Sequence, residues 1–216
     1  MDDLAREVAA ALIEIGAVSF SPSQPVKFKS GLLSPIYIDN RCLPFHPDAW
    51  RLVIGGFEQL IRVCALDPDV IAGVETAGIP HSAALAYHLH KPSVFVRKQV
   101  KDHGAMRRVE GGSVEGKKVL LVEDHITTGG SSLTKVGDLR AEGALVQDCL
   151  AITSYGFPEA AAGFDAAGVR IHVLCELSTL LAAALVRGRF GEEAMAVILD
   201  WSREPWGWAA RHGLSR

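Results

Sequence analysis

The sequence lacks the features of a secreted, membrane-spanning or metal-cluster protein. Its four cysteines (Cys42, Cys64, Cys149 and Cys175) are far apart and form no CxxC or Cys/His metal motif, which favours reduced, buried thiols in a cytoplasmic protein. The N-terminal segment "MDDLAREVAAALIEIG" is acidic and amphipathic, unlike a signal peptide. No apolar run approaches the ~20 residues that cross a bilayer. We therefore expect a cytoplasmic protein with no membrane partner.

A large excess of charge of either sign is also missing. The net charge is -3 and the isoelectric point is about 6.2, so the chain has no general attraction to nucleic acid, and any cationic site must be a local cluster. We see no repeat, low-complexity tract or linker. With 216 residues, of which 49% are hydrophobic, the chain suits a single domain over 1–216 with a substantial core.

Hydrophobic periodicity predicts an α/β fold. Helical spacing covers 2–15, ended by Gly16, and 49–65, where Asp48 is a candidate cap. Two short extended pieces lie around "VKFKSG" and "SPIYIDNR". From residue 70 onward, β-rich runs (69–75, 93–98, 117–124, 146–155 and 169–177) alternate with helical segments (80–90, 131–142 and 158–167), and helices at 178–189, 191–199 and 203–212 follow. This alternation predicts a central parallel sheet flanked by helices.

The stretch "VLLVEDHITTGGS" (119–131) carries the strongest functional signal. The run "VLLV" predicts a buried strand, which places Glu123 and Asp124 at its carboxyl end, where open α/β sheets bind ligands. The small residues of 127–131 lead into a helix whose first N–H groups have no partner within the helix, and such groups bind phosphate. An acidic pair alone would more simply cap a strand end. The unbroken order of strand, acids, loop and helix favours a binding site.

This loop is not that of a nucleotide triphosphatase. A P-loop needs a Lys followed by Ser or Thr directly after its glycines, whereas the first lysine here, Lys135, lies inside the helix. Two carboxylates beside a cradle for one phosphate suit a sugar phosphate, because carboxylates accept hydrogen bonds from neighbouring ribose hydroxyls.

At this point the stretch resembles the phosphoribosyl-diphosphate signature of the type I phosphoribosyltransferases. Three further blocks, "KFKSGLLSPIYIDNR" (27–41), "AGVETAGIPHSAALA" (72–86) and "VRKQVKDHG" (96–104), resemble those of orotate phosphoribosyltransferase and occur in the same order. The resemblance spans about 12–180. It implies the type I phosphoribosyltransferase fold, with a core over about 66–178 and a small hood subdomain formed mainly by 1–45 and the C-terminal helices.

A cationic segment, "RKQVKDHGAMRRVEGG" (97–112), follows the second predicted core strand. Its glycines (Gly104, Gly111 and Gly112) indicate a mobile loop, and cations on such a loop suit a polyanion that is enclosed and released. From charge alone, a solvated surface loop is the simpler interpretation. Next to a binding site for a sugar phosphate, a functional interpretation is favoured, because the cations of the loop can neutralise a departing pyrophosphate.

The resemblance assigns roles to individual residues. It implies a homodimer in which loop 98–112 reaches the neighbouring active site, with Lys101, His103 and Asp124 as catalytic residues. It implies that phosphoribosyl diphosphate is bound by Arg97, Lys98, Lys101, His103, Glu123, Asp124, His125, Ile126, Thr127, Thr128, Gly129, Gly130 and Ser131. A magnesium ion is expected as cofactor, held mainly through the donor diphosphate, with no direct protein ligand assigned.

The chain departs from the family pattern at three places. The turn after the first core strand has Thr76 and Ala77 where some members carry a Tyr-Lys pair, so one cationic contact to pyrophosphate is missing. His125 stands where the family usually has an apolar residue; it either lines the cleft or caps it. The segment "AITSYGFPEAAAGF" (151–164) has no cation, although some relatives place there an Arg that contacts the orotate carboxylate.

For the base, the resemblance implies a site formed by Lys29, Tyr37 and Thr127, in which Lys29 offsets the carboxylate of orotate. The expected reaction is transfer of the phosphoribosyl group from phosphoribosyl diphosphate to orotate, which gives orotidine 5′-phosphate and pyrophosphate for UMP synthesis. Two alternatives stay open: transfer to another base, and a non-catalytic sensor of phosphoribosyl diphosphate. We expect Trp201, Trp206 and Trp208 to serve core or dimer packing.

Overall fold

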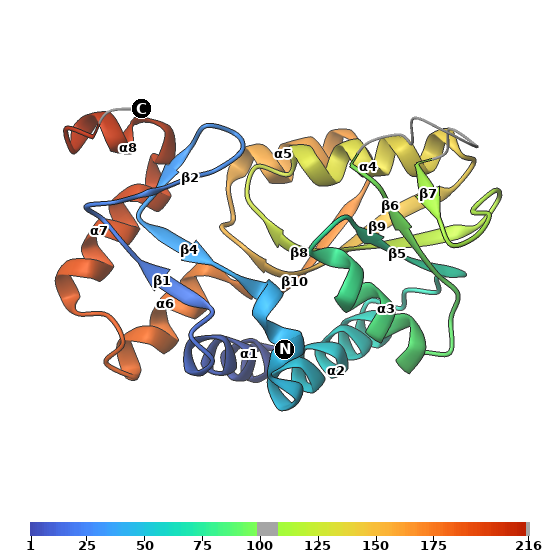
Figure 1. Cartoon of the computed structure of the whole chain (residues 1–216), viewed down its shortest axis with the longest axis horizontal. Helices are drawn as coiled ribbons and strands as arrows, with labels where there is room; N and C mark the ends of the chain where they lie inside the picture. Colours follow the sequence, from blue (N-terminus) through green and yellow to red (C-terminus); the bar gives the residue numbers. More distant parts are fainter. Residues whose placement is uncertain (99–107, 215–216) are drawn as a thin grey trace.

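A computed structural model describes residues 1–98 and 108–214. Its centre is a six-stranded sheet in the order β10-β9-β8-β5-β6-β7 (Figure 1). The strands are β5 (Val70–Val74), β6 (Ser93–Val96), β7 (Val109–Glu110), β8 (Lys118–Ile126), β9 (Leu145–Ser154) and β10 (Arg170–Glu176). All pairs are parallel except β6 with β7. The predicted α/β class with a central parallel sheet flanked by helices is confirmed.

Helices cover both faces of this sheet. One face carries α1 (Asp2–Glu14), α2 (Pro47–Val63) and α3 (Gly78–His88); the other carries α4 (Gly130–Ala141) and α5 (Pro158–Ala166) (Figure 1). Every residue of β5 is buried, because a central strand between two helical layers has no solvent face. The carboxyl ends of β5, β8 and β9 consequently share one edge of the molecule, where the chain turns into loops.

Two small strand pairs and the C-terminal helices lie beside this edge. β1 (Val18–Phe20) pairs with β4 (Ile36–Ile38), and β2 (Val26–Lys27) pairs with β3 (Leu33–Ser34), both antiparallel. A 3-10 helix, η1 (Asn40–Phe45), leads from β4 into the core. The chain closes with α6 (Leu177–Val186), α7 (Glu192–Arg203) and α8 (Pro205–Arg211). We call residues 18–45, which contain β1–β4 and η1, together with α7 and α8 the hood; α1 itself packs against β10 and α6.

Several predicted boundaries need correction. The second helix begins at Pro47, so Asp48 lies inside its first turn and is not its cap; a proline with fixed φ readily opens a helix. The helix predicted at 191–199 extends to Arg203, and Glu204, whose side chain accepts from the Gly207 N–H, caps the next helix. Strand β7 lies within the segment predicted as loop 98–112. Strands β1 and β3 were not predicted.

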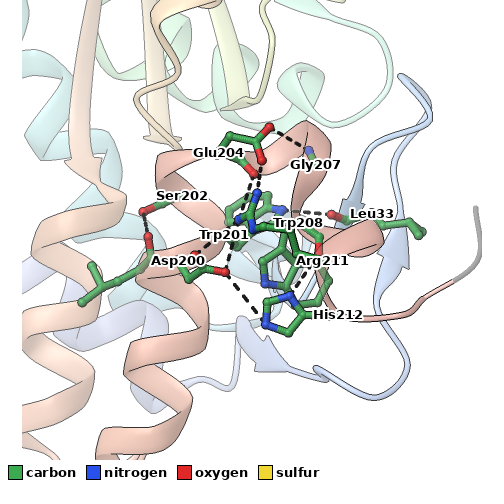
Figure 2. Close-up of polar contacts among 10 residues, drawn as sticks. Leu33, Asp200, Trp201, Ser202, Glu204, Gly207, Trp208, Arg211 and His212 are labelled. Carbon is green, nitrogen blue, oxygen red and sulfur yellow. Dashed lines mark hydrogen bonds and ion pairs between the residues drawn. The ribbon is translucent and has the colours of Figure 1, made fainter.

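The C-terminal tryptophans pack the hood together. Trp201 and Trp208 are fully buried, as expected, whereas Trp206 is 43% exposed and donates to Glu159. Figure 2 shows the Trp201 indole N–H donating to the Leu33 carbonyl at 2.9 Å, a bond that joins α7 to β3. The Trp201 ring also meets Tyr155 edge-on, with ring centroids 5.0 Å apart. The C-terminal helices therefore fix the hairpin β2–β3 relative to the core.

The two buried tryptophans offer a matched test of that bond. Trp208 Nε1 is buried without a hydrogen-bond partner among the described residues. Trp201→Phe removes the hydrogen bond to the Leu33 carbonyl, whereas Trp208→Phe shrinks a buried ring without removing a hydrogen bond. Urea unfolding at one protein concentration should show a greater loss of unfolding free energy for Trp201→Phe, by about 1 kcal/mol or more. Equal losses would show that the bond to Leu33 adds nothing beyond the packing of the ring.

Candidate active site at the carboxyl end of the sheet

A cavity of about 760 Å³ lies at the carboxyl ends of β5 and β8, beneath the hood. Its wall combines residues far apart in the sequence: Phe28, Lys29, Ser30 and Arg41 from the hood side, Val74 to Ala77 after β5, Lys98 after β6, Glu123 to His125 on β8, and Thr127 to Ser132 with Thr134 around the start of α4. Most of the predicted site residues are thus brought together in one place.

The acidic pair at the end of β8 is the electrostatic centre of this wall. Glu123 is 6% exposed and accepts hydrogen bonds from the Ser132 hydroxyl (2.9 Å) and the Asp124 N–H (3.1 Å). Burial raises the pKa of Glu123 well above its usual range, and the neighbouring Asp124 raises it further. Burial also raises the pKa of Asp124. Glu123 therefore holds its proton more strongly than an exposed glutamate does.

The loop after β8 forms the predicted cradle. Gly129 caps α4 with φ +79°, and a Cβ there would lie 3.0 Å from the Phe164 ring, so both backbone and space favour glycine. Helix α4 begins at Gly130, and the first N–H groups of a helix have no acceptor within it. Thr127, Thr128 and Ser131 line the cavity beside them. Small side chains thus surround a helix N-terminus, an arrangement that can bind one phosphate.

The turn after β5 forms the far wall of the cavity. A cis peptide bond joins Glu75 to Thr76, and the Glu75 carboxylate accepts a hydrogen bond from the Lys98 N–H at 2.5 Å. A Cβ at Gly78 would lie 2.5 Å from the Val122 carbonyl, so this position brings α3 directly against β8. The turn and the start of the cationic segment therefore lie together at this end of the site.

His125 is a neutral part of the wall. Its Nδ1 lies 2.8 Å from the Thr153 hydroxyl, and its ring meets Tyr155 edge-on with centroids 4.3 Å apart. Its Nε2 is buried without a hydrogen-bond partner in the described part of the chain. Burial lowers the pKa of His125 to about 3. The histidine that replaces the usual apolar residue therefore adds no positive charge beside the acidic pair at neutral pH.

The hood end of the cavity differs from the sequence interpretation. Tyr37 does not appear on the cavity wall; its hydroxyl accepts from Arg41 Nη2 at 3.0 Å, and its ring packs near Phe28. Phe28 and Arg41 line the cavity, and neither was singled out from the sequence. Arg41 is the last residue of the block 27–41 that resembles the family, so a positive charge inside that block was the sequence signal that could have identified it as a binding residue. Only the fold shows that it faces the acidic pair.

Four other predicted residues are not part of the described wall. Lys101 and His103 lie outside the described residues. Arg97 forms an ion pair with Glu110 at 3.2 Å, and Ile126 is buried in the core beneath α4 and α5. In 1–98 and 108–214, no three His, Cys, Asp or Glu side chains are grouped so that they could hold a metal ion.

Comparisons with known proteins agree with this geometry. Residues 46–145 match the model of the phosphoribosyl transferase domain family. The orotate phosphoribosyltransferase of Coxiella burnetii is 39% identical over 204 residues, which are 94% of this chain and 98% of that protein. The UMP synthase of Leishmania donovani has a TM-score of 0.82 at 25% identity, over 93% of this chain and 42% of the other.

A further solved structure contains a ligand. The orotate phosphoribosyltransferase of Mycobacterium tuberculosis in complex with 5-phospho-α-D-ribosyl 1-diphosphate has a TM-score of 0.63 at 26% identity, over 82% of this chain and 98% of that chain.

Within the described residues, no helix is both long and apolar enough to cross a membrane.

The buried acid predicts a pH dependence of stability. In the unfolded chain Glu123 has the ordinary pKa of 4.5, and in the folded protein its pKa is higher. The free energy of unfolding is therefore greatest below pH 4.5 and decreases as the pH rises through the folded-state pKa. Glu123→Gln removes this loss, so its unfolding free energy relative to the wild type should increase as the pH rises above the usual glutamate pKa of 4.5, as measured by urea unfolding without ligand. Glu7→Gln, at an exposed position on α1, is the control. A constant difference for Glu123→Gln would contradict the raised pKa.

Proposed function

Because the chain belongs to the orotate phosphoribosyltransferases, we propose that it transfers the 5-phosphoribosyl group from phosphoribosyl diphosphate to orotate in UMP synthesis. The products are orotidine 5′-phosphate and pyrophosphate. The observation that carries the proposal is the junction of the acidic pair on β8 with the cradle at the start of α4, inside one cavity. The cradle takes the 5-phosphate, and the acidic pair faces the ribose.

In the reaction, a ring nitrogen of the base forms a bond to ribose C1 and loses its proton as the bond from C1 to the diphosphate oxygen breaks, and the departing pyrophosphate can accept that proton. Positive character develops on the ribose and negative charge on the leaving group. Asp124, on the cavity wall, stabilises the first, since a carboxylate aimed at developing positive charge lowers the barrier. Lys98 and the backbone of the turn after β5 line the same cavity, and in this proposal they bind the leaving group. Lys101 and His103 would add cations there.

Magnesium is proposed as the cofactor, held mainly by the donor diphosphate and water. The fit is supported by the chemistry of the wall, where Glu75 and Asp124 supply oxygen atoms of the kind that magnesium prefers. In the described part of the chain, these acids do not form a cluster of three metal-binding side chains. The ion would supply charge neutralisation for the diphosphate, which matters more here because Thr76 and Ala77 replace a cationic contact.

We also propose a cytoplasmic homodimer. All four cysteines are unpaired, as in proteins of a reducing compartment. The face of α2 and α3 carries a groove lined by Trp50, Ile54 and Tyr87, of which Tyr87 is 85% exposed. Exposed apolar side chains around a groove suit a protein interface.

A turnover assay with orotate, phosphoribosyl diphosphate and magnesium tests the function, with Asp124→Asn as the informative variant. Orotidine 5′-phosphate should form with the wild type. Asp124→Asn keeps the shape of the side chain but removes its charge, so turnover should fall by roughly 10²-fold or more. Unfolding temperatures of both proteins control for the fold. Wild-type activity that the substitution leaves unchanged would remove Asp124 from the ribose site.

Subunit mixing tests the shared loop. Lys101→Ala should depress turnover far more than donor affinity, because its charge acts mainly on the leaving group. If the loop crosses the dimer, mixing Lys101→Ala with Asp124→Asn subunits should restore activity, since some mixed dimers pair an intact loop with an intact acid. Mixtures shown by mass spectrometry to exchange subunits, yet still inactive, would mean that each loop serves its own cavity.

A further inference from the structure

Arg41 places a guanidinium at the hood end of the active-site cavity. It is the second residue of η1, and it lines the cavity together with Phe28, Lys29 and Ser30. Its side chain is 57% exposed, so it is available to a ligand. The described part of the wall carries three lysines or arginines: Lys29, Arg41 and Lys98. Two of the three are therefore at the hood end, away from the turn after β5.

The backbone that carries Arg41 is fixed to the catalytic edge of the sheet. The preceding residue, Asn40, is fully buried, and its amide donates to the Asp124 carbonyl at 2.8 Å and to the Thr153 hydroxyl at 2.7 Å. These bonds join η1 to the ends of β8 and β9. Arg41 therefore keeps a defined position relative to the acidic pair.

The guanidinium itself is held by a bidentate contact. Its Nε donates to Asp39 Oδ1 at 2.6 Å, and Nη2 donates to Asp39 Oδ2 at 2.7 Å and to the Tyr37 hydroxyl. An exposed ion pair adds little stability, but a bidentate contact fixes the plane of the guanidinium. Nη1 makes no hydrogen bond within the described residues, which leaves one edge of the group for a ligand.

The positive charge of Arg41 sets the sign of that ligand. The hydrogen bond to Asp39 raises the pKa of Arg41, and the charges of Asp39 and Asp124 add to this effect, so Arg41 stays protonated. Asp39 occupies the Nε and Nη2 edge of the guanidinium, and the Nη1 edge can donate to an anion. The reactants carry three anionic groups: the 5-phosphate, the diphosphate and the carboxylate of the base. In the proposed function, the cradle at α4 binds the 5-phosphate, and Lys98 with the turn after β5 binds the diphosphate.

The third anion has few other partners. Residues 151–169, which comprise the end of β9, the loop after it and α5, contain no lysine or arginine. Phe28 gives the hood end an apolar ring surface, and Lys29 is its immediate neighbour. An aromatic surface beside two cations matches a flat ring that bears a carboxylate.

We propose that Arg41 is a specificity-determining residue that binds the carboxylate of the pyrimidine base, together with Lys29. The inference rests on the proposed function and names a residue that selects orotate over bases without a carboxylate. Asp39 acts as the positioning residue that orients the guanidinium, and Nη1 donates to the carboxylate. The missing cation after β9 is thereby replaced from the hood.

Two nucleotides that differ only in the carboxylate test the proposal. Orotidine 5′-phosphate has the carboxylate and uridine 5′-phosphate lacks it, so both share all contacts to the ribose and phosphate. Calorimetric titration should show that Arg41→Gln weakens binding of orotidine 5′-phosphate by roughly 10- to 100-fold, the usual range for a hydrogen bond between charged groups. Binding of uridine 5′-phosphate should change by less than about 3-fold, which also shows that the variant folds.

Arg170→Gln is the matched control. Arg170 is similarly exposed (66%) and pairs with Asp148 at 2.8 Å, but it lies at the opposite end of the sheet, where β10 begins. It should change neither affinity. Equal weakening of both nucleotides by Arg41→Gln, or no weakening of either, would overturn the role of Arg41. A wild-type protein that does not bind orotidine 5′-phosphate would instead overturn the proposed function, and this inference with it.

Discussion

The hydrogen bonds of Asn40 are the contact on which the arrangement of the site depends. Asn40 lies on the hood side of the chain, 84 residues before Asp124, yet its amide holds the carbonyl of that residue and the Thr153 hydroxyl. A fully buried amide left without partners would cost free energy, so the contact fixes how the hood meets the sheet. The hood end of the cavity is thereby set against the acidic pair, and in the proposed reaction the two substrates meet between them.

The same edge of the sheet carries an electrostatic cost. Glu123 and Asp124 are adjacent, and burial raises the pKa of both, so the folded protein holds two carboxyl groups where their ionised forms are disfavoured. Ser132 and the Asp124 N–H offset part of this cost by donating to Glu123. His125, which burial keeps neutral, gives no ionic compensation. Positive character that develops on a ribose beside this pair would stabilise the ionised carboxylates, and this interaction would lower the barrier of the reaction.

Much of this could be predicted from the sequence, for identifiable reasons. The alternation of buried strands with amphipathic helices determines the α/β class, and the order of strand, acids and small residues in 119–131 locates the cradle, because all its parts are contiguous. The four strands of the hood are only 2 or 3 residues long, too short to show a period, and two of them, β1 and β3, were missed. The start of α2 was wrong because the fixed φ of Pro47 outweighed the capping preference of Asp48.

The hood end of the cavity was harder to predict, because its residues act through contacts distant in sequence. Tyr37 and Arg41 are four residues apart, and a local pattern cannot tell which of them faces the ligand. Tertiary contacts determine which residue lines the cavity. Asn40 donates to the Asp124 carbonyl on β8, and the Tyr37 ring packs against Phe28. Arg41 lies on the cavity wall. Phosphate recognition uses backbone N–H groups and so leaves a sequence signature of small residues. In the proposed site, isolated side chains of the hood bind the base, so those residues could change while the cradle stays the same.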